Sequence, residues 1–388
     1  MKTGLDRILA EPSALRGRVG LIANPTTVDA TLVHAADRFA AHPDIDLRLL
    51  FGPEHGIRSD AQYMEGVGDE KDDATGLPVV SLYGDTFESL SPKAEHLEQL
   101  DTLVFDIQDI GTRYYTYAAT MALAMKATEG RSVKIVVLDR PNPLGGVAVE
   151  GSGIEAGLES FVGLYSVPQR HGMTVGELAH LYRDHFGIDC ELEVIPCEGW
   201  SRAQLFDQTD LPWVMPSPNM PTVETALVYP GMCLLEGTSV SEGRGTTRPF
   251  ELFGAPYVDG GALARALHAM ELPGLRCRPC AFTPTFDKYT GELCRGVQLH
   301  VTDRDAFLPY RTGIAVLAAM KAFYPGEFSW RKEAYEFRDD VPAIDLLTGS
   351  AEIRLAIDDE KSLDEIMALN DFALDGFESA RDKARLYR

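Results

Sequence analysis

The first half of the chain alternates short, mainly apolar runs with segments of helical periodicity. The apolar runs that we interpret as strands cover residues 18–23, 46–51, 78–83, 101–106, 133–138 and 191–195. Helices are predicted for residues 32–41, 116–128 and 174–186. The last of these begins with Thr174 as N-cap and Glu177 three residues later, the pattern of a capping box. Apolar strands that alternate with helices are typical of an α/β fold, in which helices cover both faces of a parallel sheet.

The pattern changes after about residue 229. Residues 231–256 are rich in glycine, threonine and charged side chains. Beyond them, strands are predicted for residues 277–283 and 296–302, and helices for 305–323, 343–347 and 363–388. A chain of 388 residues is also long for a single hydrophobic core. We therefore predict two domains, a parallel-sheet domain over 1–229 and a smaller α+β domain over 230–388.

Composition narrows the class of protein. Hydrophobic residues make up 45% of the chain and charged residues 24%, a normal globular balance. The formal net charge of −23 argues against a nucleic-acid partner, because the chain repels phosphate. There is no run of about 18 apolar residues, so we expect no membrane partner. Residues 1–7 lack the apolar segment of an export signal, which predicts a cytoplasmic protein. A monomer and a homodimer are both compatible with these features.

The common cofactor motifs are missing from the sequence. It has no G-x-G-x-x-G after the first strand, no P-loop, no H-E-x-x-H and no G-x-S-x-G elbow. Cys277 and Cys280 form a C-x-x-C pair, but a structural zinc site would need a second pair, and only Cys294 lies nearby. We therefore expect reduced thiols, no metal and no cofactor.

Polar side chains follow four of the first five predicted strands. Ligands of open parallel sheets bind beyond the carboxyl ends of the strands, so these side chains are candidate binding residues. They are Asn24 after the first strand, Glu54, His55 and Arg58 after the second, Asp106, Gln108, Asp109, Arg113, Tyr115 and Tyr117 after the fourth, and Asp139, Arg140 and Asn142 after the fifth.

Three later loops add further candidates. One precedes a predicted helix N-terminus, which suits an anion, although a helix cap beside a surface arginine would look the same. Another is rich in proline. The third has glycines that let a ligand approach the backbone closely, although a flexible interdomain hinge would also be rich in glycine. The candidates are Arg170 and His171 in the first loop, Asn219 in the second, and Glu236, Glu242 and Arg244 in the third.

Carboxylates, arginines and aromatic rings together favour glycoside chemistry. One carboxylic acid protonates the leaving oxygen, and a second group acts on water or on the anomeric carbon. Glu54 is the first candidate for the acid, while a solvated loop glutamate is the alternative interpretation. Asp106 and Asp109 could instead cap the end of the sheet by accepting backbone N–H groups. One or more of the tyrosines at 114, 115 and 117 could simply pack against the following helix.

Six segments in this order resemble the NamZ-type exo-β-N-acetylmuramidases. They are residues 52–56 (GPEHG), 106–117, 138–143 (LDRPNP), 170–174 (RHGMT), 216–221 (PSPNMP) and 236–246. The resemblance covers nearly the whole chain. It implies a Rossmann-like catalytic domain with a smaller C-terminal domain that closes the cleft. It also implies release of terminal N-acetylmuramic acid from the non-reducing end of peptidoglycan fragments, with Glu54 as the catalytic glutamate.

Other parts of the mechanism stay open at this point. Glu242, Glu236 and Asp109 compete for the role of second catalytic group, and the acetamido group of the substrate could also act. The lactyl carboxylate of muramic acid needs a cation, and arginine pairs a carboxylate with two hydrogen bonds. We expect at least one of five arginines to bind it: Arg58, Arg113, Arg140, Arg170 or Arg244.

Two other functions remain possible on the sequence alone. The first is a metal-assisted amidase acting on muropeptides, with His55, Asp109 and His171 as metal ligands. The second is a non-catalytic protein that binds amino sugars in the same cleft. The partner in each of these cases is a small carbohydrate-containing molecule.

Overall fold

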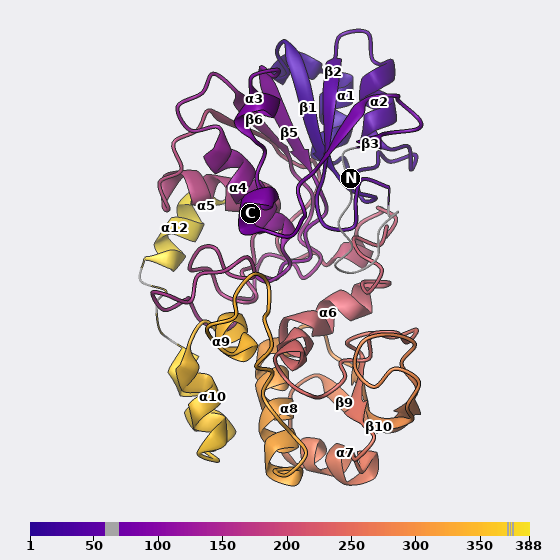
Figure 1. The fold of residues 1–388 in the computed structure, drawn as a ribbon, viewed down its shortest axis with the longest axis vertical. Helices are drawn as coiled ribbons and strands as arrows, with labels where there is room; N and C mark the ends of the chain where they lie inside the picture. Colours follow the sequence, from indigo (N-terminus) through magenta and orange to yellow (C-terminus); the bar gives the residue numbers. More distant parts are fainter. Residues whose placement is uncertain (59–69, 371, 373, 375) are drawn as a thin grey trace.

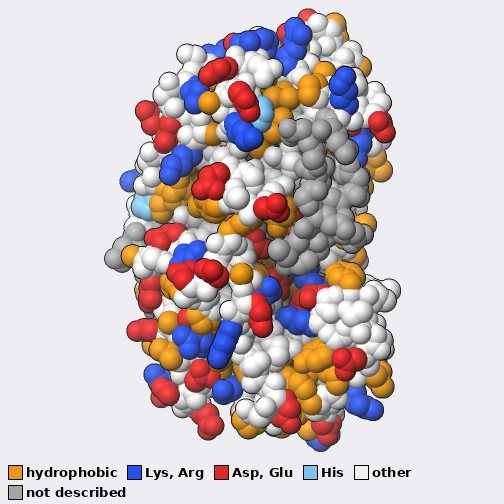
Figure 2. Space-filling model, viewed as in Figure 1, with side chains coloured by type: hydrophobic (Ala, Val, Ile, Leu, Met, Phe, Trp, Pro, Cys, Tyr) orange, Lys and Arg blue, Asp and Glu red, His pale blue; other side chains and the backbone are white. Residues whose placement is uncertain are grey.

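The computed structural model describes residues 1–58, 70–370, 372, 374 and 376–388. Within them the chain forms two units that follow one another along the long axis of the molecule (Figure 1). The larger unit is built around a seven-stranded sheet and the smaller one around a three-stranded sheet. On the face seen in Figure 2, acidic and basic side chains are scattered over both units.

The larger sheet has the strand order β3-β4-β2-β1-β5-β6-β7. Every neighbouring pair in it is parallel except β3 and β4, which are antiparallel. This confirms the predicted α/β class with a mainly parallel sheet. The strands are β1 (Arg18–Ala23), β2 (Asp46–Gly52), β3 (Glu70–Lys71), β4 (Pro78–Ser81), β5 (Thr102–Asp106), β6 (Lys134–Leu138) and β7 (Leu192–Ile195).

Both faces of this sheet are buried, which explains why its central strands are apolar. On β5, Leu103 and Phe105 belong to one hydrophobic core and Val104 belongs to the other, because successive side chains point to opposite faces. Helices supply the covering layers: α1 (Gly4–Ala10), α2 (Ala35–Ala41), α3 (Ala94–Leu97), α4 (Tyr117–Ala127) and α5 (Val175–Asp184). The predicted capping box of Thr174 and Glu177 is confirmed at the start of α5.

The smaller unit has an antiparallel sheet in the order β8-β10-β9. Its strands are β8 (Leu252–Ala255), β9 (Leu275–Phe282) and β10 (Cys294–Val301). Its helices are α6 (Val223–Met232), α7 (Gly260–Ala269), α8 (Pro309–Phe323), α9 (Ala343–Thr348), α10 (Ala351–Asp358) and α11 (Leu363–Met367). Helix α8 begins four residues later than expected, at Pro309, because proline without an N–H group suits the first helical position. Among the described residues, no helix is both long and apolar enough to cross a membrane.

The single helix predicted over 363–388 is wrong. Helix α11 ends at Met367, and a separate helix, α12 (Phe377–Ala384), begins after Gly376, whose positive φ of 75° is incompatible with a continuous helix. Figure 1 shows α12 beside α5 of the larger unit, against which it packs. The last residues of the chain therefore return to the larger unit. The predicted domain boundary after residue 229 falls inside α6, which packs against α8.

The Arg140–Asp106 pair lets us predict a stability effect. Both side chains are buried, and Arg140 Nε and Asp106 Oδ1 are 2.5 Å apart. Arg140→Leu should lower the free energy of unfolding by about 3–5 kcal/mol, because it leaves Asp106 buried without its cation. Denaturant unfolding measures the loss. The control is Arg48→Leu in the exposed pair with Asp46, which should cost about 0–1 kcal/mol. Equal losses in the two variants would contradict the prediction.

Candidate active site

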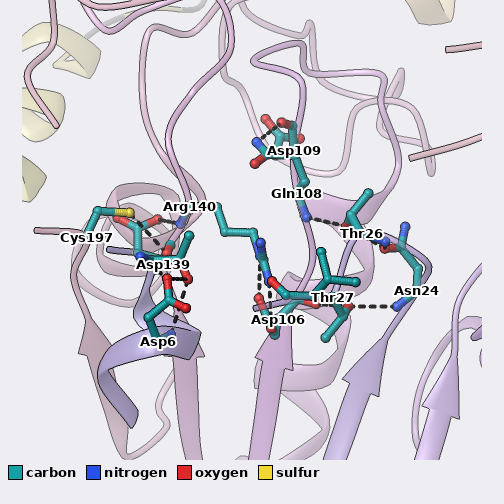
Figure 3. Close-up of polar contacts among 12 residues, drawn as sticks. Asp6, Asn24, Thr26, Thr27, Asp106, Gln108, Asp109, Asp139, Arg140 and Cys197 are labelled. Atoms are coloured by element: carbon teal, nitrogen blue, oxygen red, sulfur yellow. Dashed lines mark hydrogen bonds and ion pairs between the residues drawn. The ribbon is translucent and has the colours of Figure 1, made fainter. Parts of the chain in front are cut away.

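The polar residues at the strand ends meet at one edge of the larger sheet, but they mainly satisfy one another (Figure 3). Asn24, after β1, accepts hydrogen bonds from the Thr26 hydroxyl at 2.6 Å and from its backbone N–H at 2.9 Å. Asp106, at the end of β5, accepts two hydrogen bonds from Arg140. Asp139, after β6, accepts hydrogen bonds from the hydroxyls of Thr174 and Tyr387. This network holds the loops of the sheet edge in place.

A central cavity lies next to this edge, where the smaller unit meets the larger one. Its empty volume is about 530 Å³, the open mouth included. Residues from the turn after β2, from the loop that leads into α4, from the proline-rich loop and from the smaller unit line it, together with Val162. They are Glu54, His55, Tyr114, Tyr115, Thr116, Tyr117, Val162, Ser217, Asn219, Met220, Tyr229, Glu236, Arg244, Phe250, Tyr335 and Glu336.

Seven of the predicted site residues line this cavity. They are Glu54, His55, Tyr115, Tyr117, Asn219, Glu236 and Arg244. The structure therefore brings together two strand ends and two loops that are distant in the sequence. Tyr335, Glu336 and Thr116 also line the cavity and were missed, and the segment of Tyr335 and Glu336 carries no motif that points to a ligand.

A tight turn after β2 places Glu54 in the cavity. His55 and Gly56 follow it with φ values of 72° and 74°, and the Gly56 N–H donates to the Pro53 carbonyl at 2.9 Å. A histidine in this left-handed region is strained, and such strain is common at functional sites. The Glu54 side chain is 13% exposed. Its Oε2 lies 3.5 Å from the Thr116 hydroxyl, a long hydrogen bond.

Burial raises the pKa of Glu54 toward neutral pH, where a general acid must hold its proton. Removal from water raises the pKa of Glu54 to about 7. The positive charge of Arg244 opposes this rise in the pKa, and the negative charge of Glu236 adds to it. Glu54 can therefore hold a proton near neutral pH and still release it.

Aromatic rings form one wall of the cavity. Tyr115 packs edge-on against Tyr117 and Tyr229, with ring centroids 5.2 and 5.6 Å apart, and Tyr229 packs against Phe250. The Tyr117 hydroxyl donates to the Pro216 carbonyl at 2.6 Å, which ties the proline-rich loop to this wall. Burial raises the pKa of the Tyr115 and Tyr117 hydroxyls, so they stay protonated. The wall offers apolar ring surface to a sugar.

Charged side chains of the smaller unit form a cluster beside this aromatic wall, and the Arg244 guanidinium lies 5.2 Å from the centroid of the Phe250 ring. Arg244 donates to Glu236 at 2.6 Å and lies 3.1 Å from Glu242, which also accepts from Lys288 at 2.9 Å. The Tyr335 hydroxyl donates to the second oxygen of Glu236 at 2.7 Å. Burial opposes the ionisation of Glu242, but Lys288 and Arg244 outweigh it and hold its pKa below the usual range. Glu236 and Glu242 are therefore balanced by two cations.

Four of the five predicted arginines do not line the central cavity. Arg58 pairs with Asp72 and Asp37, and Arg170 with Glu150. Arg113 is buried and donates to backbone carbonyls, among them those of Ser152, Val167 and Leu347, and Arg140 is held by Asp106. These side chains stabilise the fold around the cavity, because each one satisfies buried or partly buried oxygen atoms. Only Arg244 of the five lies in the cavity wall.

The remaining candidates also lie outside the wall of the central cavity. Gln108 donates to two carbonyls and, with Arg140, faces a separate hollow near Thr26. Asn142 bonds to the backbone of Met173 and Leu144. Asp109 accepts from the Gly111 N–H and lies 3.5 Å from the His171 ring. Glu242 does not line the cavity, but it lies 3.1 Å from Arg244, which does.

The ligand set suggested for an amidase is not assembled in the described part of the chain. Asp109 faces His171, whereas His55 lies in the central cavity 3.8 Å from Glu54. Within residues 1–58, 70–370, 372, 374 and 376–388, no group of three or more His, Cys, Asp or Glu side chains could hold a metal ion.

A buried carboxylic acid that faces tyrosines and further carboxylates is the kind of site that glycoside hydrolases use. The family model described as "Exo-beta-N-acetylmuramidase NamZ, N-terminal" matches residues 19–224, and its C-terminal counterpart matches residues 227–387. The chain therefore belongs to the exo-β-N-acetylmuramidase NamZ family, as the six sequence segments predicted.

Individual relatives agree with this family assignment. The chain is 46% identical over 389 residues to the peptidoglycan β-N-acetylmuramidase NamZ of Bacillus subtilis, and the match covers 100% of this chain and 91% of that protein. Two solved structures of DUF1343 family proteins from Bacteroides fragilis are also similar. They have TM-scores of 0.91 and 0.77 and are 35% and 29% identical, and each match covers 100% of this chain and 99% of the other.

The strained turn after Glu54 can be tested by substitution. His55 has a φ of 72°, which glycine adopts freely and β-branched residues resist. His55→Val should therefore be less stable than His55→Gly by about 1–3 kcal/mol, measured by denaturant unfolding. Because both variants lose the imidazole, the comparison isolates the backbone. A His55→Val protein as stable as His55→Gly would show that the turn is not strained.

Proposed function

We propose that this protein uses Glu54 as the general acid of an exo-acting glycoside hydrolase. Its family and the Bacillus subtilis relative, which is named a peptidoglycan β-N-acetylmuramidase, define the activity. That activity is release of terminal N-acetylmuramic acid from the non-reducing end of peptidoglycan fragments. The observation that carries the role of Glu54 is its burial beside Thr116 in the central cavity, with a pKa raised to about 7.

The reaction requires a proton on the glycosidic oxygen as the bond to the anomeric carbon breaks. A neutral glutamic acid can donate that proton, whereas an ionised one cannot. Burial keeps Glu54 protonated at a pH where an exposed glutamate is ionised.

The aromatic wall and the proline-rich loop suit the sugar ring. Tyr115, Tyr229 and Phe250 present apolar ring edges, and Asn219 adds an amide to the same cavity. Sugars bind to sites of this kind because the C–H faces pack on aromatic rings while the hydroxyls find polar partners. The cavity therefore offers both kinds of contact to one terminal residue.

Arg244 is our choice for the arginine that binds the lactyl carboxylate. Of the five predicted arginines it is the one in the cavity wall, where its guanidinium also pairs with Glu236 and lies 3.1 Å from Glu242. Lys288 supplies a second positive charge behind Glu242, so the charged cluster does not repel a carboxylate outright. A contact of Arg244 with the lactyl carboxylate would make the enzyme prefer muramic acid over N-acetylglucosamine, which lacks the lactyl group.

Glu54→Gln should abolish hydrolysis of the muramic-acid disaccharide, because the amide has the shape of the acid but no proton to donate. The expected loss in kcat/KM is about 10²–10⁴-fold. The assay follows release of N-acetylmuramic acid, with the exposed Glu98→Gln as control. If Glu54→Gln kept wild-type activity while binding the disaccharide normally, Glu54 would not be the acid.

The pH dependence of kcat/KM follows from the raised pKa of Glu54. The acid is protonated below a pH of about 7 and ionised above it. Activity that depends on the proton should therefore fall as the pH rises through about 7. A pH–rate profile of the folded protein measures this limb. Activity that kept increasing up to pH values well beyond this range would be inconsistent with Glu54 as the donor.

Preference for muramic acid should depend on the planar guanidinium group of Arg244, which can donate two parallel hydrogen bonds to a carboxylate. Arg244→Lys keeps the charge but loses paired donation to a carboxylate. It should reduce the ratio of kcat/KM for a chromogenic β-N-acetylmuraminide over the matching N-acetylglucosaminide by about 10-fold or more. Arg58→Lys is the matched control, because Arg58 pairs with Asp37 and Asp72 outside the cavity. An unchanged ratio in Arg244→Lys would remove Arg244 from this role.

A further inference from the structure

The reaction needs a second group besides the acid, and the turn at residues 335–338 supplies one. We propose that Glu336 is the second catalytic carboxylate, the base that takes a proton from the water molecule that attacks the anomeric carbon. This inference rests on the proposed function, with Glu54 as the acid. Glu336 lines the same central cavity as Glu54 but comes from the smaller unit.

The backbone of this turn is held in an unfavourable conformation. Tyr335 and Arg338 exchange two backbone hydrogen bonds of 2.8 and 3.0 Å, and the two residues between them, Glu336 and Phe337, have φ values of 46° and 67°. Turns with two positive φ angles normally contain asparagine and glycine, because other side chains are strained there. Here a glutamate and a phenylalanine occupy both positions. The chain keeps a strained turn where a relaxed sequence would fold more easily.

Contacts on both sides hold the turn in this conformation. The Phe337 ring packs edge-on against Tyr83, Phe87 and Phe161, with centroids 6.1–6.3 Å apart. Arg338 donates to the carbonyls of Glu159 at 2.7 Å and Gly157 at 3.0 Å. On the other side, the Tyr335 hydroxyl donates to Glu236. The turn thus connects the two units, and Glu336 is at its tip.

Glu336 differs from the other carboxylates of the site. Glu236 is engaged at both oxygens by Arg244 and Tyr335, and Glu242 by Arg244 and Lys288. By contrast, Glu336 Oε2 is buried and has no hydrogen-bond partner among the described residues. Burying a carboxylate oxygen without a hydrogen-bond donor costs free energy. A glutamate in this position therefore indicates a ligand that donates a hydrogen bond to this oxygen. Water or a substrate hydroxyl can do this.

Glu54 and Glu336 also influence each other's protonation. Burial raises the pKa of Glu336, and the negative charges of Glu54 and Glu236 raise it further. Two neighbouring carboxyl groups lose their protons in separate steps, so there is a pH range in which the pair holds a single proton. The pKa of Glu336 is raised to about 8 and that of Glu54 to about 7, so in the free protein the shared proton lies mainly on Glu336. The proposed roles therefore require bound substrate to draw this proton to Glu54, which leaves Glu336 as the base.

The proposed step balances in atoms and charge. The bond between the anomeric carbon and the leaving oxygen breaks, and this oxygen takes the proton of Glu54. The oxygen of water bonds to the anomeric carbon, and Glu336 takes a proton from that water. At the end Glu54 is ionised and Glu336 is protonated, and exchange of one proton with solvent restores the starting state.

The two roles can be separated with two substrates that differ in their leaving group. The muramic-acid disaccharide needs an acid, whereas 4-nitrophenyl β-N-acetylmuraminide has a leaving group that departs without protonation. Glu54→Gln should therefore lose much more activity on the disaccharide than on the nitrophenyl substrate. Glu336→Gln should lose about 10²–10⁴-fold in kcat on both substrates, because water needs the base in either case. Glu333→Gln, an exposed glutamate of the same segment, is the matched control.

A second measurement distinguishes loss of the base from damage to the fold. Azide attacks without a general base, so added azide should restore turnover of the nitrophenyl substrate by Glu336→Ala and give a glycosyl azide. Retained activity of Glu336→Gln on both substrates, or a folded Glu336→Ala protein that azide does not rescue, would overturn the role of Glu336. Failure of the wild-type protein to hydrolyse either substrate would instead overturn the proposed function.

Discussion

Burial of several carboxylates in one cavity is the constraint on which the site depends. Glu236 pairs with Arg244, and Glu242 pairs with both Arg244 and Lys288, so each of these two carboxylates has a cation beside it. Glu54 has no ion pair with a lysine or arginine among the described residues, and burial makes its charge costly. The Glu54 carboxyl group therefore keeps its proton to a higher pH than an exposed glutamate does. Burial without an ion pair thus makes Glu54 and Glu336, rather than Glu242, the carboxyl groups that can hold a proton near neutral pH.

The fold provides the rigidity that this balance requires. The strand-end network fixes the edge of the larger sheet, including the Arg140–Asp106 pair and the contacts of Asp139 with Thr174 and Tyr387. From that edge the turn after β2 carries Glu54, and the start of α4 carries the tyrosines. The smaller unit adds the charged cluster and the strained turn of Glu336. The site is complete only where the two units meet.

Several features were predictable because they are local. The buried strands, the capping box of α5 and the Glu54 turn leave direct patterns in the sequence, and the family resemblance covers all of them. The arginine that faces the cavity was harder to predict. Arg58, Arg113, Arg140 and Arg170 lie in the right segments, yet each is held by a partner at least 14 residues away in the chain or by backbone carbonyls. Sequence shows that a cation is present but not whether its charge is already neutralised.

Hydrophobic periodicity and short motifs were enough to predict the α/β class, the family and the position of the candidate acid, because they are properties of neighbouring residues. The folded chain was needed to show which charges are paired, that α12 returns to the larger unit, and that Glu336 faces the same cavity as Glu54. Pairing and burial depend on residues far apart in the chain, such as Glu54 and Glu336. A segment without a recognisable motif can therefore supply a functional group, and its burial and geometry reveal it.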